Sequence, residues 1–430
     1  MEARDCPGAE RLGDKAARKA LAELYGRAGI EAQAARYARL GELAAADGVA
    51  SGRRWYSAPG RTELGGNHTD HNRGRVLCAA VRLDAVACVA PTGDLRVRLV
   101  SEGYAEPIAV DLGDLEPRPD ERGTTAALVR GVARGLADRG VAPSGFAGRM
   151  HSTVLPGSGL SSSAAVEVLL ATILADLAGA RLPPIELAKV GQYAENAYFG
   201  KPCGLMDQAA SAMGGIVSID FADPAAPKVK RIEYDFEEEG YALVVVNTGG
   251  SHADLTADYA SVPAEMRAVA SLLGAEVLRQ VEPGLLVARG PEIRAACGDR
   301  ALLRALHFVA ENARVQEMAQ ALKEEELKRY LKLVKKSGDS SWRLLQNLYP
   351  PSDPAEQGLP LALALSADYL GKKGAWRVHG GGFAGTIQAY VPAKLLPGYS
   401  ALMERYFGPG CVMPVAVRPV GATRVMHEED

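Results

Sequence analysis

Apolar positions at the spacing of a helix mark the beginning of the chain. They run from about Leu12 to Ala46, and two glycines interrupt them, which predicts a pair of helices. From Trp55 the pattern changes to short apolar runs, and Trp55–Ala58 and Val76–Val81 predict strands. We therefore expect a helical arm that leads into a β-sheet.

Strands and helices then follow one another without regular alternation. The runs at 86–89 and 95–99 predict two strands, which we expect to form a hairpin around the turn Pro91–Asp94. Further strands are expected at 146–154, 216–221, 242–247 and 386–391, and helices at 162–177, 185–199, 263–273 and 302–348. Such a mixture is typical of the α+β class, which we predict for both halves of the chain.

The length of 430 residues predicts more than one domain, because single hydrophobic cores rarely grow beyond roughly 250–300 residues. The proline-containing segment Asp223–Pro227 is the best candidate for a boundary. We accordingly expect a helical arm at residues 1–50, a first domain at 51–228 and a second domain at 229–430.

The charge pattern narrows the classes of partner. Lys and Arg number 49 against 52 Asp and Glu, a net charge of -3, and no long block of like charge occurs, so we expect neither nucleic acid nor a membrane as a partner. The charged start of the chain lacks the apolar core of a signal peptide. Six cysteines without metal-ligand spacing indicate a reducing compartment. We expect a cytoplasmic protein that binds small molecules, as a monomer or weak homo-oligomer.

The densest group of polar residues lies in the turn-rich segment Pro59–Asn72, between two expected strands. Loops held by a scaffold often carry function, and burying so many polar groups is costly unless each finds a partner. A polar ligand such as a sugar would supply those partners. Taken alone, the segment could also be a plain surface turn.

The segment Leu155–Ala165 joins an expected strand to an apolar helix and combines glycines with three consecutive serines. Glycines let the backbone approach a ligand closely, and free N–H groups at a helix N-terminus attract anions. The segment follows neither the Walker nor the Rossmann pattern. One serine would be enough to cap a helix, so three of them favour a phosphate-binding loop.

Two carboxylates follow this loop, Glu195 on an expected helix and Asp207 at the start of the next element. The turn Gly200–Pro202 between them can bring the two together. Phosphoryl transfer needs a metal ion that bridges the phosphates and a base beside the attacking hydroxyl, and the two carboxylates would divide those roles. Each of them could instead be an ordinary helix charge.

A third loop, His379–Gly385, holds four glycines within six residues and precedes an apolar strand. So many glycines indicate close approach of the backbone to another group, or unusual φ angles.

In this order the segments resemble the motifs of the GHMP small-molecule kinase superfamily, most closely those of its galactokinases. The resemblance runs from about residue 55 towards the C-terminus, and Cys203–Gln208 and the serine-containing loop match best. It implies a two-domain α+β fold with a ribosomal-protein-S5-like first domain and a ferredoxin-like second domain, preceded by the helical arm. It also implies ATP and Mg²⁺ as cofactors and phosphorylation of the anomeric hydroxyl of D-galactose to α-galactose 1-phosphate.

The same resemblance implies roles for individual residues. Asp207 would take or orient the proton of the anomeric hydroxyl, and Arg61 would lower the pKa of Asp207 and steady the phosphoryl group. Ser162 and Glu195 would hold Mg²⁺. The sugar would be bound by Asn67, His68, Asp70, Gly204 and Tyr259. The ATP phosphates would lie against Gly157, Ser158, Gly159, Leu160, Ser161, Ser162 and Ser163, and the floor between the domains would be formed by Gly381, Gly382 and Phe383.

Several positions depart from the galactokinase pattern. Asn67 replaces the glutamate that holds the sugar's 6-hydroxyl, and Glu63 replaces an asparagine. Because Asn67 can form hydrogen bonds without carrying charge, it would tolerate a C6 carboxylate. Galacturonate or another modified galactose is therefore the alternative substrate, and a sugar-sensing protein without catalysis is a further alternative. Thr125 and Leu128 replace the usual aromatic residues of the nucleotide pocket, which leaves the nucleotide base open.

Overall fold

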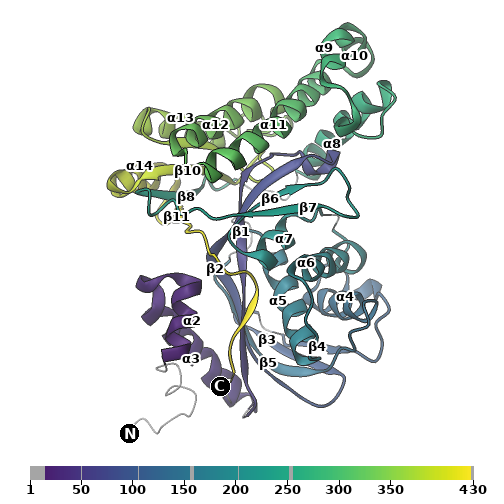
Figure 1. The fold of residues 1–430 in the computed structure, drawn as a ribbon, viewed down its shortest axis with the longest axis vertical. Helices are drawn as coiled ribbons and strands as arrows, with labels where there is room; N and C mark the ends of the chain where they lie inside the picture. Colours follow the sequence, from purple (N-terminus) through teal and green to yellow (C-terminus); the bar gives the residue numbers. More distant parts are fainter. Residues whose placement is uncertain are drawn as a thin grey trace.

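The computed structural model describes residues 15–49, 51–104, 106–154, 159–201, 203–250 and 255–427. Two β-sheets and the helices packed on them make up the molecule (Figure 1). The arm consists of α2 (Lys15–Tyr25) and α3 (Ile30–Ala46), as the spacing of its apolar residues predicts. Buried side chains of both helices, such as Leu21 and Tyr37, pack with Trp55 and Val86 of the larger sheet.

The larger sheet contains the strands of the first half of the chain and its last strand. The strand order is β12-β1-β2-β5-β3-β4, and β6 pairs with both β2 and β7. The bounds are β1 (Arg54–Gly65), β2 (Arg75–Pro91), β3 (Arg96–Ser101), β4 (Ile108–Asp111), β5 (Phe146–Ser152), β6 (Ile216–Asp220), β7 (Lys228–Ile232) and β12 (Thr423–His427). β1 and β2 pair antiparallel from Arg54 opposite Val89 to Gly65 opposite Leu77, so the polar segment of the sequence lies where β1 ends and turns into β2.

Both faces of this sheet are covered, which explains the long apolar run of β2. The arm lies on one side, and α4 to α7 lie on the other (Figure 1). These helices are α4 (Thr125–Ala137), α5 (Ser162–Leu177), α6 (Pro184–Tyr193) and α7 (Met206–Met213). The helix expected at 185–199 is α6 followed by a π-helical segment, η4 (Ala194–Phe199).

The predicted hairpin of residues 86–89 with 95–99 is wrong. β2 pairs instead with β5, from Ala85 opposite Ser152 to Pro91 opposite Phe146. β3 lies on the far side of β5 and runs parallel to it. The alternation of apolar and basic residues identifies β3 as a half-buried strand, but alternation sets which face is buried and not which strand is the neighbour.

The smaller sheet has the order β11-β8-β10-β9, with β8 (Tyr241–Asn247), β9 (Ala375–His379), β10 (Thr386–Pro392) and β11 (Val412–Pro414). The helices of this half are α8 (Thr256–Leu272), α9 (Pro283–Ala288), α10 (Gly290–Cys297), α11 (Asp299–Lys323), α12 (Leu327–Ser340), α13 (Gly358–Leu370) and α14 (Leu396–Phe407). The helical stretch expected at 302–348 is divided between α11, α12 and the π-helical segment η6 (Ser341–Leu345). Mixed sheets and helices of this arrangement give the α+β architecture expected from the sequence.

The two sheets do not divide the chain at a single point. β7 begins at Lys228, beside the expected boundary, and pairs with β6 in the larger sheet. β12 returns from the far end of the chain to pair with β1, with Arg54 opposite His427. α11 also packs against β1 and β2, so both halves of the chain meet around the end of β1.

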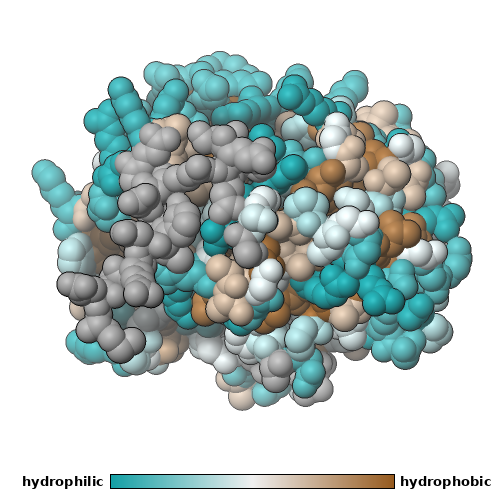
Figure 2. All heavy atoms as spheres, turned by 90° about the horizontal axis from the view of Figure 1, so that it is seen from below, coloured by the Kyte–Doolittle hydropathy of each residue, from teal (hydrophilic) through white to brown (hydrophobic). Residues whose placement is uncertain are grey.

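Polar and apolar side chains are interspersed on the face seen from below in Figure 2. Isolated apolar residues on a surface are ordinary. None of the helices in the described ranges combines the length and the apolarity that crossing a membrane requires.

Candidate active site

Three loops meet where β1 ends: the polar loop (residues 66–74), the serine loop (residues 159–163, as far as described) and the glycine loop (residues 380–385). The N–H of Arg61 donates to Leu160 O at 2.9 Å, which joins β1 to the serine loop. His68 Nε2 lies 2.8 Å from Gly381 O, which joins the polar loop to the glycine loop. The loops that the sequence singles out are therefore brought together by the fold.

Each loop also holds a non-glycine residue in the left-handed backbone region, and the polar loop holds a second one at Arg73. The φ angles are 57° at His68, 60° at Ser161 and 61° at Phe383. Such angles are uncommon outside glycine, and they concentrate at functional sites, where the surrounding structure enforces them. The three loops are thus held in defined conformations.

Asp207, in the first turn of α7, lies at the centre of this arrangement. Arg61 donates to it twice, from Nε to Oδ1 at 2.6 Å and from Nη2 to Oδ2 at 2.7 Å. Ser161 Oγ donates to Oδ2 as well, and Arg61 Nη1 donates to Gly159 O. A bidentate pair of this kind fixes both side chains in orientation, so β1, α7 and the serine loop are fastened together at one carboxylate.

The electrostatics keep Asp207 ionised. Burial acts to raise its pKa, but the charge of Arg61 and the hydrogen bonds from Arg61 and Ser161 outweigh burial and hold the pKa below its ordinary value. The Asp207 side chain is 28% exposed, whereas that of Arg61 is 10% exposed. An ionised carboxylate with an open side can accept a proton from a hydroxyl placed beside it.

The residues expected to bind a sugar border the glycine loop and α7. Tyr259 Oη donates to Gly382 O at 2.8 Å, beside the contact of His68 with Gly381. Asp70 faces Gly204, where a Cβ atom would lie 2.6 Å from Asp70 Oδ2, so a side chain at this position would require Asp70 to move. Asn67 differs from the others because it is completely buried.

The serine loop continues directly into α5. Gly157 and Ser158 lie outside the described residues. Gly159 and Leu160 turn their carbonyls to Arg61, and Ser161, Ser162 and Ser163 are partly exposed. The free N–H groups of a helix start and adjacent hydroxyls form a binding site suited to phosphate oxygens.

Glu195 lies in the π-helical segment η4 and is 2% exposed. Its Oε1 accepts from Ser163 Oγ at 3.0 Å and lies 3.4 Å from Lys201 Nζ, and its Oε2 accepts from Gln208 Nε2 at 2.9 Å. π-helical turns are frequent at functional sites. Mg²⁺ in kinases takes one or two carboxylates together with substrate phosphates, and the carboxylate and hydroxyls at this place fit that donor chemistry.

Glu167 is a carboxylate that the sequence reasoning missed. It is completely buried on α5 and accepts from Gln208 Nε2 at 2.9 Å, and its Oε1 has no partner in the described part of the chain. Burial raises its pKa well above the ordinary value, and the charge of Glu195 adds to the shift. An acid in the interior of the apolar run of α5, whose other acid Asp176 lies at its end, was the signal that could have found it.

The positions where we expected aromatic residues of a nucleotide pocket lie on α4. Thr125 is its first residue, and Leu128 is 4% exposed and belongs to the main hydrophobic core. Leu128 therefore contributes to packing of the domain.

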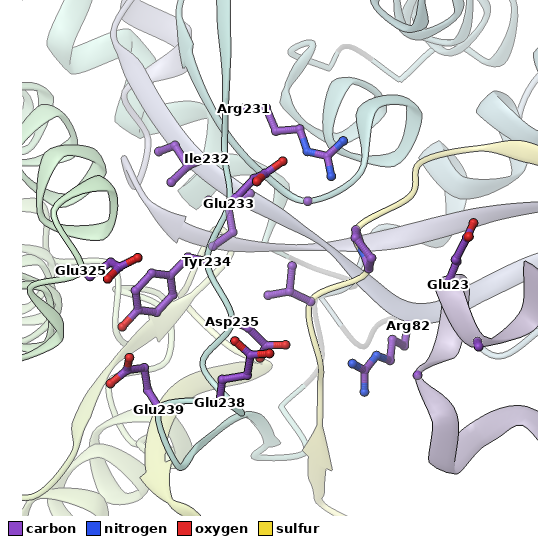
Figure 3. Close-up of a pocket in the computed structure, with 16 residues that line it drawn as sticks. Glu23, Arg82, Arg231, Ile232, Glu233, Tyr234, Asp235, Glu238, Glu239 and Glu325 are labelled. Carbon is purple, nitrogen blue, oxygen red and sulfur yellow. The ribbon is translucent and has the colours of Figure 1, made fainter. Parts of the chain in front are cut away.

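A separate cavity of about 680 Å³ lies between α2 and the end of β7 with the segment that follows it (Figure 3). Its lining is rich in acidic residues, and Tyr234 extends between Glu239 and Glu325. None of the expected sugar, phosphate or Mg²⁺ residues is among the described residues that line it.

Comparisons with known proteins agree with this geometry. The model of the GHMP kinases N terminal domain matches residues 127–215, and that of the galactokinase galactose-binding signature matches residues 48–91. The chain is 35% identical over 355 residues to the galactokinase of Streptomyces coelicolor, which covers 82% of this chain and 88% of that protein. It is 30% identical over 338 residues to the galactokinase of Glaesserella parasuis, which covers 78% of this chain and 84% of that one.

Solved structures show the same fold. The crystal structure of Lactococcus lactis galactokinase complexed with galactose matches with a TM-score of 0.75 at 23% identity, over 95% of this chain and 98% of that chain. A mevalonate kinase structure matches with a TM-score of 0.60 at 16% identity, over 84% and 98% of the two chains. Taken with the sequence relatives, these matches show that the chain belongs to the galactokinase family of the GHMP kinases and is a sugar kinase, a phosphotransferase.

Proposed function

We propose that this kinase transfers the γ-phosphoryl group of ATP to the anomeric hydroxyl of D-galactose and forms α-galactose 1-phosphate. The observation that carries the proposal concerns the carboxylate of Asp207. Arg61 and Ser161, the residue before α5, donate hydrogen bonds to it, and 28% of the Asp207 side chain remains exposed. A phosphate bound at the serine loop would thus lie beside the residue that receives the proton.

In this proposal Asp207 takes or orients the proton of the anomeric hydroxyl. Since its pKa lies below the ordinary value, its effectiveness depends on position more than on basicity. Arg61 fixes the carboxylate and adds positive charge beside the transferring group, where negative charge is spread over the phosphoryl oxygens. Glu195 and Ser162 would hold Mg²⁺, which would supply positive charge beside the phosphates.

The substrate is inferred from two sources. The curated relatives are galactokinases and one matched structure is complexed with galactose. In addition, His68, Asp70, Tyr259 and Gly204 lie around the glycine loop and α7, on the elements that adjoin Asp207. We assign the contacts with sugar hydroxyls to these residues.

Galacturonate is the second candidate, because the polar loop carries a second histidine, His71, beside His68. The rings of His68 and His71 lie 6.1 Å apart. His68 already donates to Gly381 O, but the His71 side chain is 44% exposed and can donate a hydrogen bond to a sugar carboxylate. This substrate would keep the same chemistry at the anomeric carbon.

A sugar panel tests the proposal. ADP release is measured with galactose, galacturonate and N-acetylgalactosamine at saturating ATP and Mg²⁺. We expect the highest kcat/KM with galactose. If galactose has the lowest value of the three sugars, galactose is not the substrate, and a highest value with galacturonate supports the second candidate.

A further inference from the structure

The side chain of Asn67 has no hydrogen-bonding capacity left for a sugar. Its Nδ2 donates to Gly380 O at 2.6 Å and to Glu63 Oε1 at 3.3 Å. Its Oδ1 accepts from Asn347 Nδ2 at 2.8 Å and from Ser341 Oγ at 3.3 Å. A side-chain amide has two donor hydrogens and two acceptor lone pairs, so protein groups occupy all four positions.

These contacts tie the polar loop to the glycine loop. Three consecutive carbonyls of the glycine loop each accept from a neighbouring side chain. Asn67 donates to the first, His68 and Asn347 both donate to the second, and Tyr259 donates to the third. A displacement of the glycine loop would therefore displace the residues to which we assign the sugar contacts.

Asn347 is the matching amide from the second half of the chain. It is completely buried, and its Nδ2 bridges Asn67 Oδ1 and Gly381 O at 2.8 and 2.9 Å. Its backbone carbonyl accepts from the N–H of Phe383 at 2.5 Å. Any side chain at Gly382 would collide with this carbonyl, so the glycine loop fits closely against residue 347.

We propose that Asn67 is a positioning residue which, together with Asn347, fastens the polar loop to the glycine loop, and that it does not bind the sugar. The inference rests on the proposed function, since it concerns the sugar site of that reaction. His68 follows Asn67 directly and has a φ of 57°, so fixing Asn67 fixes where His68 and then Asp70 lie. Selectivity at C6 of the sugar is consequently set by other side chains.

The first experiment compares galactose with 6-deoxygalactose as substrates for Asn67→Ala. A positioning residue affects both sugars alike, so we expect kcat/KM to fall by the same factor for both, about 10- to 100-fold. The fall should come mainly from a higher KM for the sugar, with the KM for ATP unchanged. A loss that is present with galactose and absent with 6-deoxygalactose would mean that Asn67 binds the 6-hydroxyl, and it would overturn the inference.

The second experiment measures whether the two amides act as one unit. If they do, kcat/KM of the double variant Asn67→Ala with Asn347→Ala should be no lower than that of the worse single variant, within about threefold. Asn72→Ala is the matched control, because Asn72 is a buried asparagine of the same loop whose Oδ1 accepts from the N–H of Leu278. The factor by which Asn72→Ala lowers kcat/KM should multiply with the factor for Asn347→Ala in their double variant. If the factors for Asn67→Ala and Asn347→Ala multiply in the same way, the inference is contradicted.

Two further measurements apply if Asn67→Ala does not fold or if the wild type does not phosphorylate galactose. If Asn67→Ala does not fold, Asn347→Ala alone must raise the KM for the sugar, and a value within about twofold of the wild type refutes the inference. If the wild type does not phosphorylate galactose, the proposed function fails. In that case urea unfolding of the same variants without ligand still tests the inference, because the unfolding free energies of the Asn67 and Asn347 variants must then be non-additive.

Discussion

Asp84 and Asp207 both bind arginine side chains, and they differ in how much of the carboxylate remains accessible. Asp84 is completely buried and is bound by Arg36 at 2.6 Å and Arg418 at 3.0 Å, with Ser57 and Tyr25 donating as well. Asp207 is bound by Arg61 and Ser161 and keeps 28% of its side chain exposed. In both cases burial acts to raise the pKa and arginine charge lowers it below the ordinary value.

The difference lies in accessibility. Every side of the Asp84 carboxylate meets protein, and it joins the arm through Arg36 and Tyr25 to the C-terminal segment through Arg418. Asp207 is fixed with the same type of donor but leaves one side available to a reactant. An arginine–aspartate pair therefore indicates function only when the carboxylate keeps an accessible side, and the sequence alone does not distinguish the two pairs.

The largest expected effects come from substituting Asp207 and Asp84, and they distinguish the roles of these two residues. Asp207→Asn removes the proposed base, so we expect turnover to fall by about 10²- to 10⁴-fold. The unfolding free energy should fall by less than in Asp84→Asn, because only one arginine loses its carboxylate and Arg61 still donates to Gly159 O. Asp84→Asn leaves two buried arginines without their carboxylate and should cost about 3–5 kcal/mol of stability, with kcat per folded molecule retained. Turnover and urea unfolding are measured on both variants. If Asp84→Asn lost more turnover per folded molecule and Asp207→Asn lost more stability, the roles assigned to the two aspartates would be wrong.

The next effect concerns the shape of the cation. Arg61→Lys keeps the charge but loses the two parallel hydrogen bonds to Asp207. We expect kcat to fall by about 10- to 100-fold and the acid limb of the pH–rate profile to move to higher pH, because Asp207 loses hydrogen bonds that lower its pKa. Profiles of kcat and of kcat/KM from pH 4 to 8 are the measurement. An unchanged kcat would show that the paired geometry is not needed.

Stability should fall on acidification, and His68 is one cause. Burial lowers the pKa of His68 to about 4, whereas in the unfolded chain it is about 6.5. Between these values the unfolded chain binds the extra proton, so this group costs stability as the pH falls from 6.5 to 4, at up to about 1.4 kcal/mol per pH unit. Urea unfolding at pH 7 and pH 5 should show the loss, and His68→Gln should show less of it. Equal slopes for the two proteins would exclude His68 as a contributor.

The smallest effect concerns the metal. Ser162 is the proposed Mg²⁺ ligand, and Ser163 contacts Glu195. We expect Ser162→Ala to raise the Mg²⁺ concentration for half-maximal activity by about tenfold and Ser163→Ala to raise it by less, since Ser163 only supports the carboxylate. Mg²⁺ titrations of both variants make the comparison. If the order is reversed, Ser163 takes the place of Ser162 as the ligand.

Much of the fold follows from local pattern in the sequence. The apolar run at 162–177 coincides with α5, and the run at 242–247 lies within β8. The neighbours of the strands could not be predicted, because β5 enters between β2 and β3 from a distant part of the chain. The return of β12 to β1 is equally non-local, and no pattern within either strand encodes it.

The candidate site likewise has features that the local sequence predicts and features that it does not. Glycines, serines and the order of the loops identified the segments that meet at the end of β1, because these residue types reflect local backbone requirements. The burial of Asn67 could not be foreseen, since its partners at Asn347 and Gly380 lie some 300 residues away in sequence, with separations of 280 and 313. Glu167 was missed because the apolar sequence of α5 is typical of any buried helix.

The most direct test of the central claim, that Asp207 acts on the anomeric hydroxyl, combines product identification with binding. Wild type and Asp207→Asn are incubated with galactose and ATP, the product is followed by phosphorus NMR, and galactose affinity is measured by calorimetry. The account predicts phosphate on C1 in the α configuration with the wild type, and almost none with Asp207→Asn, which still binds galactose with a Kd within about threefold of the wild type. Phosphorylation by Asp207→Asn at a rate close to that of the wild type would contradict the account.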